Sequence, residues 1–430
     1  MSSTGFAFAN PQPSPDNFDE FNPQDVYADS SIQATPVTEP IPAPWKTPPV
    51  MSLSDVLGAS AIAEIQASEQ IVFHAAGDTG GIKEPSHQFA VADAMSADIG
   101  GKSYASGRPA LFYHLGDVVY YFGQERYYYD QFYDPYRDYD APIFAIPGNH
   151  DGVIFSGEPV KYSLEPFYNN FCSRTPSHDP AAQDLARTTM TQPGVYFTLN
   201  APFAKIIGLY TNTSESTGVI SGGSAGSDQL TFLKAQLQDA ASQRAQQGGD
   251  PFALILAVHH PPFTISNSHW PSPQMLKQID DACAAARIWP DLVLAGHAHL
   301  YERYTRAMKA DGRQIPYVVA GNGGYFNLSK VRTGKRGLAP RPGVPGNDGQ
   351  GNSVTLDAYN NTQYGFLRLT VTASSILCES LGVDESTGKT SSLDTFTLDL
   401  TKHVLKGAAR ASKTRAGAKV TRKAPRKRKK

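Results

Sequence analysis

Five short apolar runs share one pattern along this chain, because each leads into a turn that combines glycine or proline with polar residues. They are "IVFHAAGD" (71–78), "ALFYHLGD" (110–117), "PIFAIPGNHD" (142–151), "ALILAVHHPP" (253–262) and "DLVLAGHAH" (291–299). Each run has the length and the β-branched or aromatic content of a buried strand. We therefore predict five buried strands, each ending in a polar turn.

The segments between these runs include amphipathic ones, and residues 227–244, "SDQLTFLKAQLQDAASQR", give the clearest helical pattern. The first residue is a serine suited to an N-terminal cap, and the second is an aspartate suited to the positive end of a helix. Leu230, Leu233 and Leu237 recur at helical spacing and form one apolar stripe. Strands that alternate with helices indicate a largely parallel or mixed sheet covered by helices.

After residue 299 the chain returns to strand-like runs. They are "IPYVVAG" (315–321), "YGFLRLTVT" (364–372), "SILCESL" (375–381) and "DTFTLDL" (394–400). Their composition is typical of strands, and they suggest a second sheet packed on the first. The pattern as a whole predicts an α/β fold with two packed, mixed β-sheets flanked by helices.

The two ends of the chain lack these patterns. Residues 1–50 are rich in Pro, Ser, Asp and Thr and poor in aliphatic residues, so we expect a disordered arm. Residues 402–430 carry 13 Lys/Arg and no Asp/Glu, which predicts a basic disordered tail. Residues 66–401 are then expected to form the folded domain. Within it, the Gly- and Pro-rich stretch 329–362 is expected to be a loop, either a functional lid or a plain insertion.

Charge is distributed unevenly between this tail and the rest of the chain. The formal net charge is −2, and the tail holds 13 of the 38 basic residues, so the remainder carries 25 basic against 40 acidic residues. The basic tail could contact nucleic acid or another polyanion, or it could serve only to keep the protein in solution.

Cysteine usage and hydropathy favour a soluble protein of a reducing compartment. Cys172, Cys283 and Cys378 are widely spaced and odd in number, which argues against a disulfide framework. The N-terminus lacks a basic and apolar leader, and no apolar run reaches 18 residues. We therefore expect a cytoplasmic protein without a membrane span.

Polar residues able to bind metal follow the five apolar runs. Because ligands bind beyond the carboxyl ends of the strands in such sheets, we expect these residues to converge at one edge. Carboxylates and imidazoles without thiolates favour Zn, Fe or Mn, and a pair of such ions needs an anionic ligand that both can share. The set comprises Asp78, Asp117, Tyr120, Asn149, His150, His259, His260, His297 and His299.

Five motifs at these positions occur in a familiar order. They are "GDTG" (77–80), "GDVVY" (116–120), "GNHD" (148–151), "AVHHPP" (257–262) and "GHAH" (296–299). Together they resemble the ordered motifs of the calcineurin-like metallophosphoesterase superfamily, across about residues 78–304. The resemblance implies an αββα sandwich with a dinuclear metal centre that hydrolyses phosphoric esters.

One departure from the common superfamily pattern indicates which group within the superfamily this chain most resembles. Gly80 stands where many members have a metal-binding histidine, and Tyr120 ends the second motif. This joint exchange, together with "GHAHLYER" (296–303), is most like the purple acid phosphatases, in which a tyrosinate binds ferric iron. A trivalent ion favours an anionic phenolate and lowers its pKa. The resemblance therefore implies two metal ions, Fe(III) and a divalent Fe, Zn or Mn ion.

The same resemblance implies a role for each residue of the site. His259 is preferred to His260 as a ligand because the family's strand commonly reads H-x-P. His260 could instead contact the metal ligands without binding a metal itself. His150 would bind the phosphate, and His269 in "SNSHWP" would protonate the leaving oxygen. The first metal site would use Asp78, Asp117, Tyr120 and His299, and the second would use Asp117 as a bridge with Asn149, His259 and His297.

These expectations amount to a metal-dependent phosphoric ester hydrolase, an acid-phosphatase-like phosphomonoesterase in which a hydroxide activated by the metals attacks phosphorus. A phosphodiesterase or nucleotide hydrolase on the same scaffold is the alternative. A nucleic-acid-binding protein with a vestigial metal site is a third, more remote hypothesis.

Overall fold

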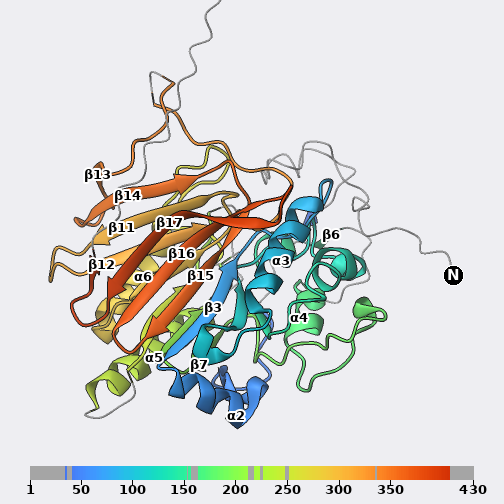
Figure 1. Ribbon diagram of the computed structural model, residues 1–430. Coiled ribbons are helices and arrows are strands. Elements are labelled where there is room, and N and C mark those ends of the chain that lie inside the picture. The colour runs from blue at the N-terminus through green and yellow to red at the C-terminus, as the bar shows by residue number, and fades with distance from the viewer. Residues whose placement is uncertain are drawn as a thin grey trace, which may run out of the picture.

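The computed structural model describes residues 34–35, 41–152, 154–155, 163–211, 217–222, 226–246, 251–334 and 337–406 (Figure 1). At 34–35 and 154–155 only the backbone is described. Most of the predicted N-terminal arm, and residues 407–430 of the predicted basic tail, lie outside the described residues. The predictions for these segments stay predictions.

Two mixed β-sheets form the centre of the molecule. The nine-stranded sheet contains, in spatial order, β13 (Pro345–Asn347), β14 (Ser353–Asn360), β11 (Tyr301–Ala307), β12 (Gln314–Ala320), β10 (Leu292–Ala295), β9 (Ala253–Ala257), β8 (Ala204–Gly208), β7 (Phe197–Ala201) and β2 (Val50–Ser52). The seven-stranded sheet contains β18 (Val404–Lys406), β17 (Lys389–Asp399), β16 (Ser375–Asp384), β15 (Gly365–Thr372), β3 (Gln70–Ala76), β4 (Pro109–His114) and β5 (Ile143–Ala145). A short separate pair joins β1 (Ala34–Thr35) to β6 (Ile154–Phe155).

The sheets pack face to face, and helices lie on their outer sides. One apolar cluster joins Phe73 and Leu111 of the seven-stranded sheet to Ile255 and Leu294 of the nine-stranded sheet, so it fills the space between them. A second cluster joins the outer faces to α3 (Ser86–Ile99), α4 (Glu165–Phe171), α5 (Asp228–Ala245) and α6 (Pro273–Ala286). In contrast, α2 (Ser54–Ala67) packs against the first cluster through its buried Ile65. The predicted fold class is confirmed.

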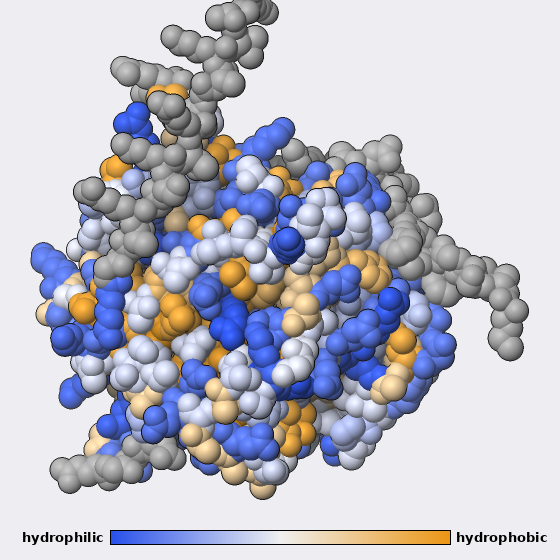
Figure 2. All heavy atoms as spheres, in the orientation of Figure 1, coloured by the Kyte–Doolittle hydropathy of each residue, from blue (hydrophilic) through white to orange (hydrophobic). Residues whose placement is uncertain are grey.

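The surface of the molecule agrees with this layering. In β16, buried residues alternate with partly buried ones over most of its length, which is typical of an antiparallel strand with one face turned to solvent. The face of the molecule that carries β15, β16 and β17 is largely hydrophilic, with scattered apolar patches (Figures 1 and 2). None of the described helices is both long and apolar enough to span a bilayer.

Each of the nine predicted strands is present, but their distribution between the sheets differs from the prediction. The later segments do not form a sheet of their own, because β12 pairs with β10 in one sheet and β15 pairs with β3 in the other. Strands that are buried on both faces read as continuous apolar runs, and such runs do not reveal which neighbour a strand selects. The predicted second sheet therefore exists, but both sheets mix early and late strands.

Three smaller predictions had different outcomes. The predicted helix at 227–244 is confirmed as α5, although the side chain of Ser227 makes no capping hydrogen bond. The stretch 329–362 is not a loop throughout, because β13 and β14 lie within it and β14 pairs antiparallel with β11. All three cysteines are buried and free, as expected.

Candidate metal centre

The candidate site lies where five strands end. Strands β3, β4 and β5 run parallel in one sheet, and β9 and β10 run parallel in the other. The turns after them carry the polar motifs. Three of the turn residues have positive φ angles, which are rare for residues other than glycine: Asp78 (57°), Asp117 (55°) and His297 (68°). Such backbone conformations cluster at functional sites.

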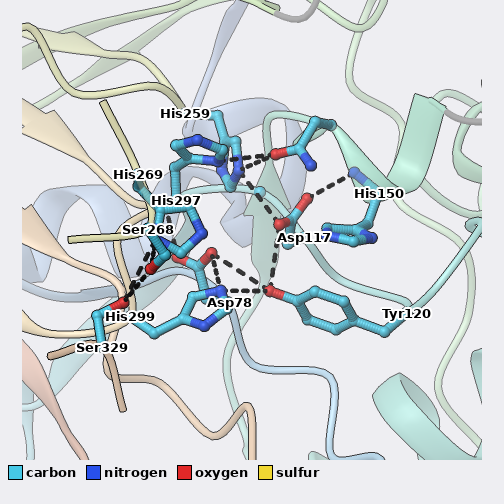
Figure 3. Close-up of polar contacts among 12 residues, drawn as sticks. Asp78, Asp117, Tyr120, His150, His259, Ser268, His269, His297, His299 and Ser329 are labelled. Atoms are coloured by element: carbon cyan, nitrogen blue, oxygen red, sulfur yellow. Dashed lines mark hydrogen bonds and ion pairs between the residues drawn. The ribbon is translucent and has the colours of Figure 1, made fainter. Parts of the chain in front are cut away.

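One group of side chains surrounds the phenol oxygen of Tyr120 (Figure 3). This oxygen lies 3.3 Å from Asp78 Oδ1, 3.1 Å from Asp117 Oδ2 and 3.3 Å from His299 Nε2. His299 Nε2 also lies 3.5 Å from Asp78 Oδ1. The other three predicted ligands of the first metal site thus all contact the Tyr120 oxygen.

A second group surrounds the amide oxygen of Asn149. This oxygen lies 3.1 Å from His259 Nε2 and 2.8 Å from His297 Nδ1. His259 Nε2 also lies 3.3 Å from Asp117 Oδ2. Asp117 therefore contacts both groups, which is the position that a ligand shared by two ions requires.

The donor set and its surroundings fit a pair of cations. Asp117, His259 and His297 offer ligand atoms within 4.8 Å of one another, and so do Asp78, Asp117 and His299. Glycines make room for the carboxylates: a Cβ on Gly148 would lie 2.1 Å from Asp117 Oδ1, and one on Gly296 would lie 2.7 Å from Asp78 Oδ2. Buried carboxylates, imidazoles and an amide, with no thiolate, suit Fe, Zn or Mn.

Burial and neighbouring charges shift the pKa values of these groups. Burial, with Asp117 and Asp78 adding to it, holds the pKa of Tyr120 well above its usual value. Burial alone would lower the pKa of His259, but the neighbouring Asp117 raises it to about 9. Burial likewise opposes ionisation of Asp117, yet His259 and His150 hold its pKa below the usual value. A cation coordinated by Tyr120 and His259 would therefore displace protons from them, so its binding would tighten as pH rises.

The Tyr120 ring needs the glycine at position 80. A Cβ on Gly80 would lie 2.7 Å from Tyr120 Cδ2 and 2.4 Å from Gln131 Oε1, both closer than real contacts allow. Gln131 fixes the backbone of the tyrosine, because its amide oxygen accepts the Tyr120 N–H at 2.9 Å and its amide nitrogen donates to the Tyr120 carbonyl at 2.8 Å. A side chain at position 80 would therefore collide with Gln131 and with the Tyr120 ring unless both moved.

Replacing Gly80 with alanine should displace the Tyr120 ring. We expect metal affinity and kcat/KM to fall by about 10- to 100-fold, the range seen when groups that orient metal ligands are disturbed. Metal titration and steady-state kinetics on Gly80→Ala measure both effects. The matched control is Gly100→Ala, since a Cβ there meets nothing closer than 3.5 Å. Unchanged metal affinity in Gly80→Ala would contradict the steric argument.

His150 and His269 also lie at this site. The His150 backbone N–H donates to Asp117 Oδ1 at 2.9 Å, and its ring centre lies 4.4 Å from that of Tyr120. The His269 ring centre lies 4.6 Å from that of His297 and 4.8 Å from that of His299. Both predicted substrate-contacting histidines are thus adjacent to the predicted ligands.

Serine hydroxyls surround the Nδ1 atom of His269. Ser266 Oγ lies 3.2 Å away, Ser268 Oγ 3.1 Å and Ser329 Oγ 3.3 Å (Figure 3). Burial keeps the pKa of His269 well below its usual value. His260 lies beside the site, because its ring centre is 4.2 Å from that of His297 and its Nδ1 contacts Thr211 Oγ1 at 2.9 Å.

Several residues that position the site were not identified from the sequence. Gln131 is one, and Tyr325 is another, since its ring centre lies 4.3 Å from those of both Tyr120 and His299. Glu302 is buried and accepts from the Ile265 N–H at 2.9 Å, which anchors the segment leading to His269. The sequence does contain a signal for the role of Glu302, because a glutamate inside an apolar and aromatic strand needs a hydrogen-bonding partner.

Comparison with known proteins agrees with the fold and the motifs. The chain belongs to the calcineurin-like phosphoesterase family, whose model matches residues 71–301, more than half of the sequence. No curated protein matches the chain.

Solved structures provide similar folds at low identity. A purple acid phosphatase, PPD1, from yellow lupin (Lupinus luteus) seeds superposes with a TM-score of 0.51 at 15% identity, covering 77% of this chain and 54% of that one. This chain thus spans about half the length of the lupin protein. PhoD has a TM-score of 0.47 at 12% identity, covering 86% of this chain and 74% of its own. The lupin similarity, at this identity, supports the fold alone.

Proposed function

We propose that this chain is a phosphatase of the purple acid phosphatase type, which hydrolyses phosphate monoesters at a dinuclear metal centre. The observation that carries the proposal is the position of Asp117, whose carboxylate belongs to both candidate ligand groups. Family membership supports a phosphoesterase, and the Gly80 and Tyr120 pair supports the purple acid phosphatase type.

In this proposal, the two metals have different ligand chemistry. The first site would hold Fe(III), because Tyr120 can supply an anionic phenolate that a trivalent ion favours. The second would hold a divalent Fe, Zn or Mn ion on neutral imidazole and amide donors. When bound, the ions would lower the pKa of a coordinated water and hold the phosphate oxygens. The first site is assigned Asp78, Asp117, Tyr120 and His299, and the second Asp117, Asn149, His259 and His297.

The remaining chemistry is assigned to histidines of this chain. His150, whose backbone N–H is bonded to Asp117, is held where its ring can face a phosphate on the metals. His269 is held by its serine contacts beside His297 and His299, and we assign it the proton that the leaving oxygen takes up.

Replacing His269 with glutamine should slow the reaction in a way that depends on the leaving group. Glutamine keeps a polar side chain near the serines but cannot supply a proton as an acid. We expect kcat to fall about 100-fold with glycerol phosphate, whose alkoxide needs a proton, and much less with p-nitrophenyl phosphate. His178→Gln is the control, since His178 is exposed and contacts only a carbonyl in the described structure. An equal loss with both substrates would argue against an acid role.

Substrate preference tests the monoesterase proposal. Turnover of p-nitrophenyl phosphate is compared with turnover of bis-p-nitrophenyl phosphate under the same conditions. We expect the monoester to be cleaved faster. Equal or faster cleavage of the diester would refute the monoesterase assignment in favour of a phosphodiesterase on the same scaffold.

A further inference from the structure

Trp270 is exposed directly beside the candidate metal centre. Among the described residues three large apolar side chains are exposed, and Trp270 is the aromatic one, with 57% of its surface accessible. It follows His269 in the sequence, and consecutive Cα atoms are about 3.8 Å apart. An exposed indole at this place is not explained by the packing of the core.

The indole is held rather than free to move. The guanidinium of Arg332 lies over its ring, 4.8 Å from the ring centre. Arg332 is itself fixed, because its guanidinium donates to the Thr264 carbonyl and its backbone N–H donates to the Ile265 carbonyl at 2.7 Å. Pro271 follows the tryptophan and restricts its backbone to extended conformations. The ring and its cation therefore form a preorganised surface.

This surface adjoins the two segments that hold His269 at the candidate metal centre. Ser266 and Val331 form a β-bridge, and the Asn267 N–H donates to the Lys330 carbonyl at 2.9 Å. The first of these paired segments places the His269 ring beside those of His297 and His299. Trp270 follows His269 in that segment, and Arg332, which covers the indole, belongs to the second segment. A leaving group that takes its proton from His269 would be within reach of the residue that follows this histidine in the chain.

We propose that Trp270, supported by Arg332, is a stacking platform for phosphate esters whose leaving group carries a flat aromatic ring, such as a nucleobase or an aryl group. The inference rests on the proposed phosphatase function and names a substrate class for it. Indole rings stack on nucleobases and aryl rings because each presents a π face, with little dependence on ring identity. Arg332 covers part of the indole, and the exposed remainder is available to a ligand.

The test compares Trp270→Leu and Trp270→Phe with the wild type on three substrates: adenosine 5′-monophosphate, p-nitrophenyl phosphate and glycerol phosphate. Stacking acts equally on the bound substrate and the transition state, so it changes KM and leaves kcat unaltered. In Trp270→Leu we expect KM to rise about 10-fold for the two ring-bearing substrates and to stay unchanged for glycerol phosphate. Phenylalanine should restore most of the loss. A rise for only one ring-bearing substrate would still support the platform and would identify the ring that it accepts.

Other outcomes overturn the proposal. An equal change for all three substrates would indicate a structural role for Trp270, and no change for any would indicate an uninvolved surface residue. Val344→Ala, at another exposed apolar side chain, should alter none of the three. If the wild type hydrolyses none of the substrates, the phosphatase proposal fails together with this one. If the wild type hydrolyses them and Trp270→Leu shows no selective loss, only the platform fails.

Discussion

Asp117→Asn is expected to abolish hydrolysis while leaving the fold intact. Asparagine has the same shape, and its Oδ1 can still accept the His150 N–H that Asp117 accepts at 2.9 Å. It cannot supply the anionic oxygen that both ligand groups share. The loss of several kcal/mol of charge stabilisation corresponds to a fall in kcat/KM of about 1000-fold or more.

Three measurements on Asp117→Asn separate this effect from misfolding. Metal content should fall, kcat/KM should collapse, and the melting temperature in the absence of metal should not fall sharply. The pKa of His259 should also fall, because Asp117 is the group that raises it. Asp140→Asn is the matched control, since the Asp140 side chain is 88% exposed in its pair with Arg108. Retention of full metal content and of activity within tenfold of the wild type would show that Asp117 is not the shared ligand.

Tyr120→Phe is expected to remove the visible absorption that a tyrosinate bound to iron(III) would give. The substitution deletes the one oxygen that lies within 3.3 Å of Asp78, Asp117 and His299, and it leaves the ring in the space beside Gly80. Because the pKa of Tyr120 is raised without a cation, ferric binding to the wild type should release a proton from the phenol. The variant should not release it.

The absorption spectrum and proton release upon iron addition are measured on the wild type and on the variant. Tyr128→Phe provides the control, because it removes another buried phenol and should leave the band unchanged. A wild type that is colourless with Zn or Mn bound, and fully active after Tyr120→Phe, would contradict the iron assignment while leaving a metallophosphoesterase in place.

The sequence predicted the strand ends of this fold well, for a physical reason. Strands buried on both faces are short apolar runs, and a chain that must turn sharply at their ends needs glycine or proline there. Asp78, Asp117 and His297 each follow such a glycine at the carboxyl end of a strand. These strand ends lie together although β3 and β4 belong to the seven-stranded sheet and β10 to the nine-stranded one, a division that the sequence did not predict.

Strand pairing and supporting contacts could not be predicted in the same way. The pairing of β3 with β15 joins His74 to Arg368 across almost 300 positions, and neither run carries a signal for the other. The Gln131 side chain bonds to the backbone N–H and carbonyl of Tyr120. Any residue at position 120 would present these two groups, so no pattern in the sequence marks this contact. Tyr325 lies within a glycine-rich turn and contacts Tyr120 only after folding.

Metal content together with hydrolysis tests the central claim most directly. The purified full-length chain is analysed by elemental mass spectrometry, and p-nitrophenyl phosphate hydrolysis is followed before chelation, after it, and after metals are added back. The dinuclear proposal predicts about two ions per chain, loss of hydrolysis on chelation and recovery on addition of iron with a divalent ion. Undiminished hydrolysis by the chelated, metal-free chain, or no hydrolysis by a chain that holds both ions, would contradict it.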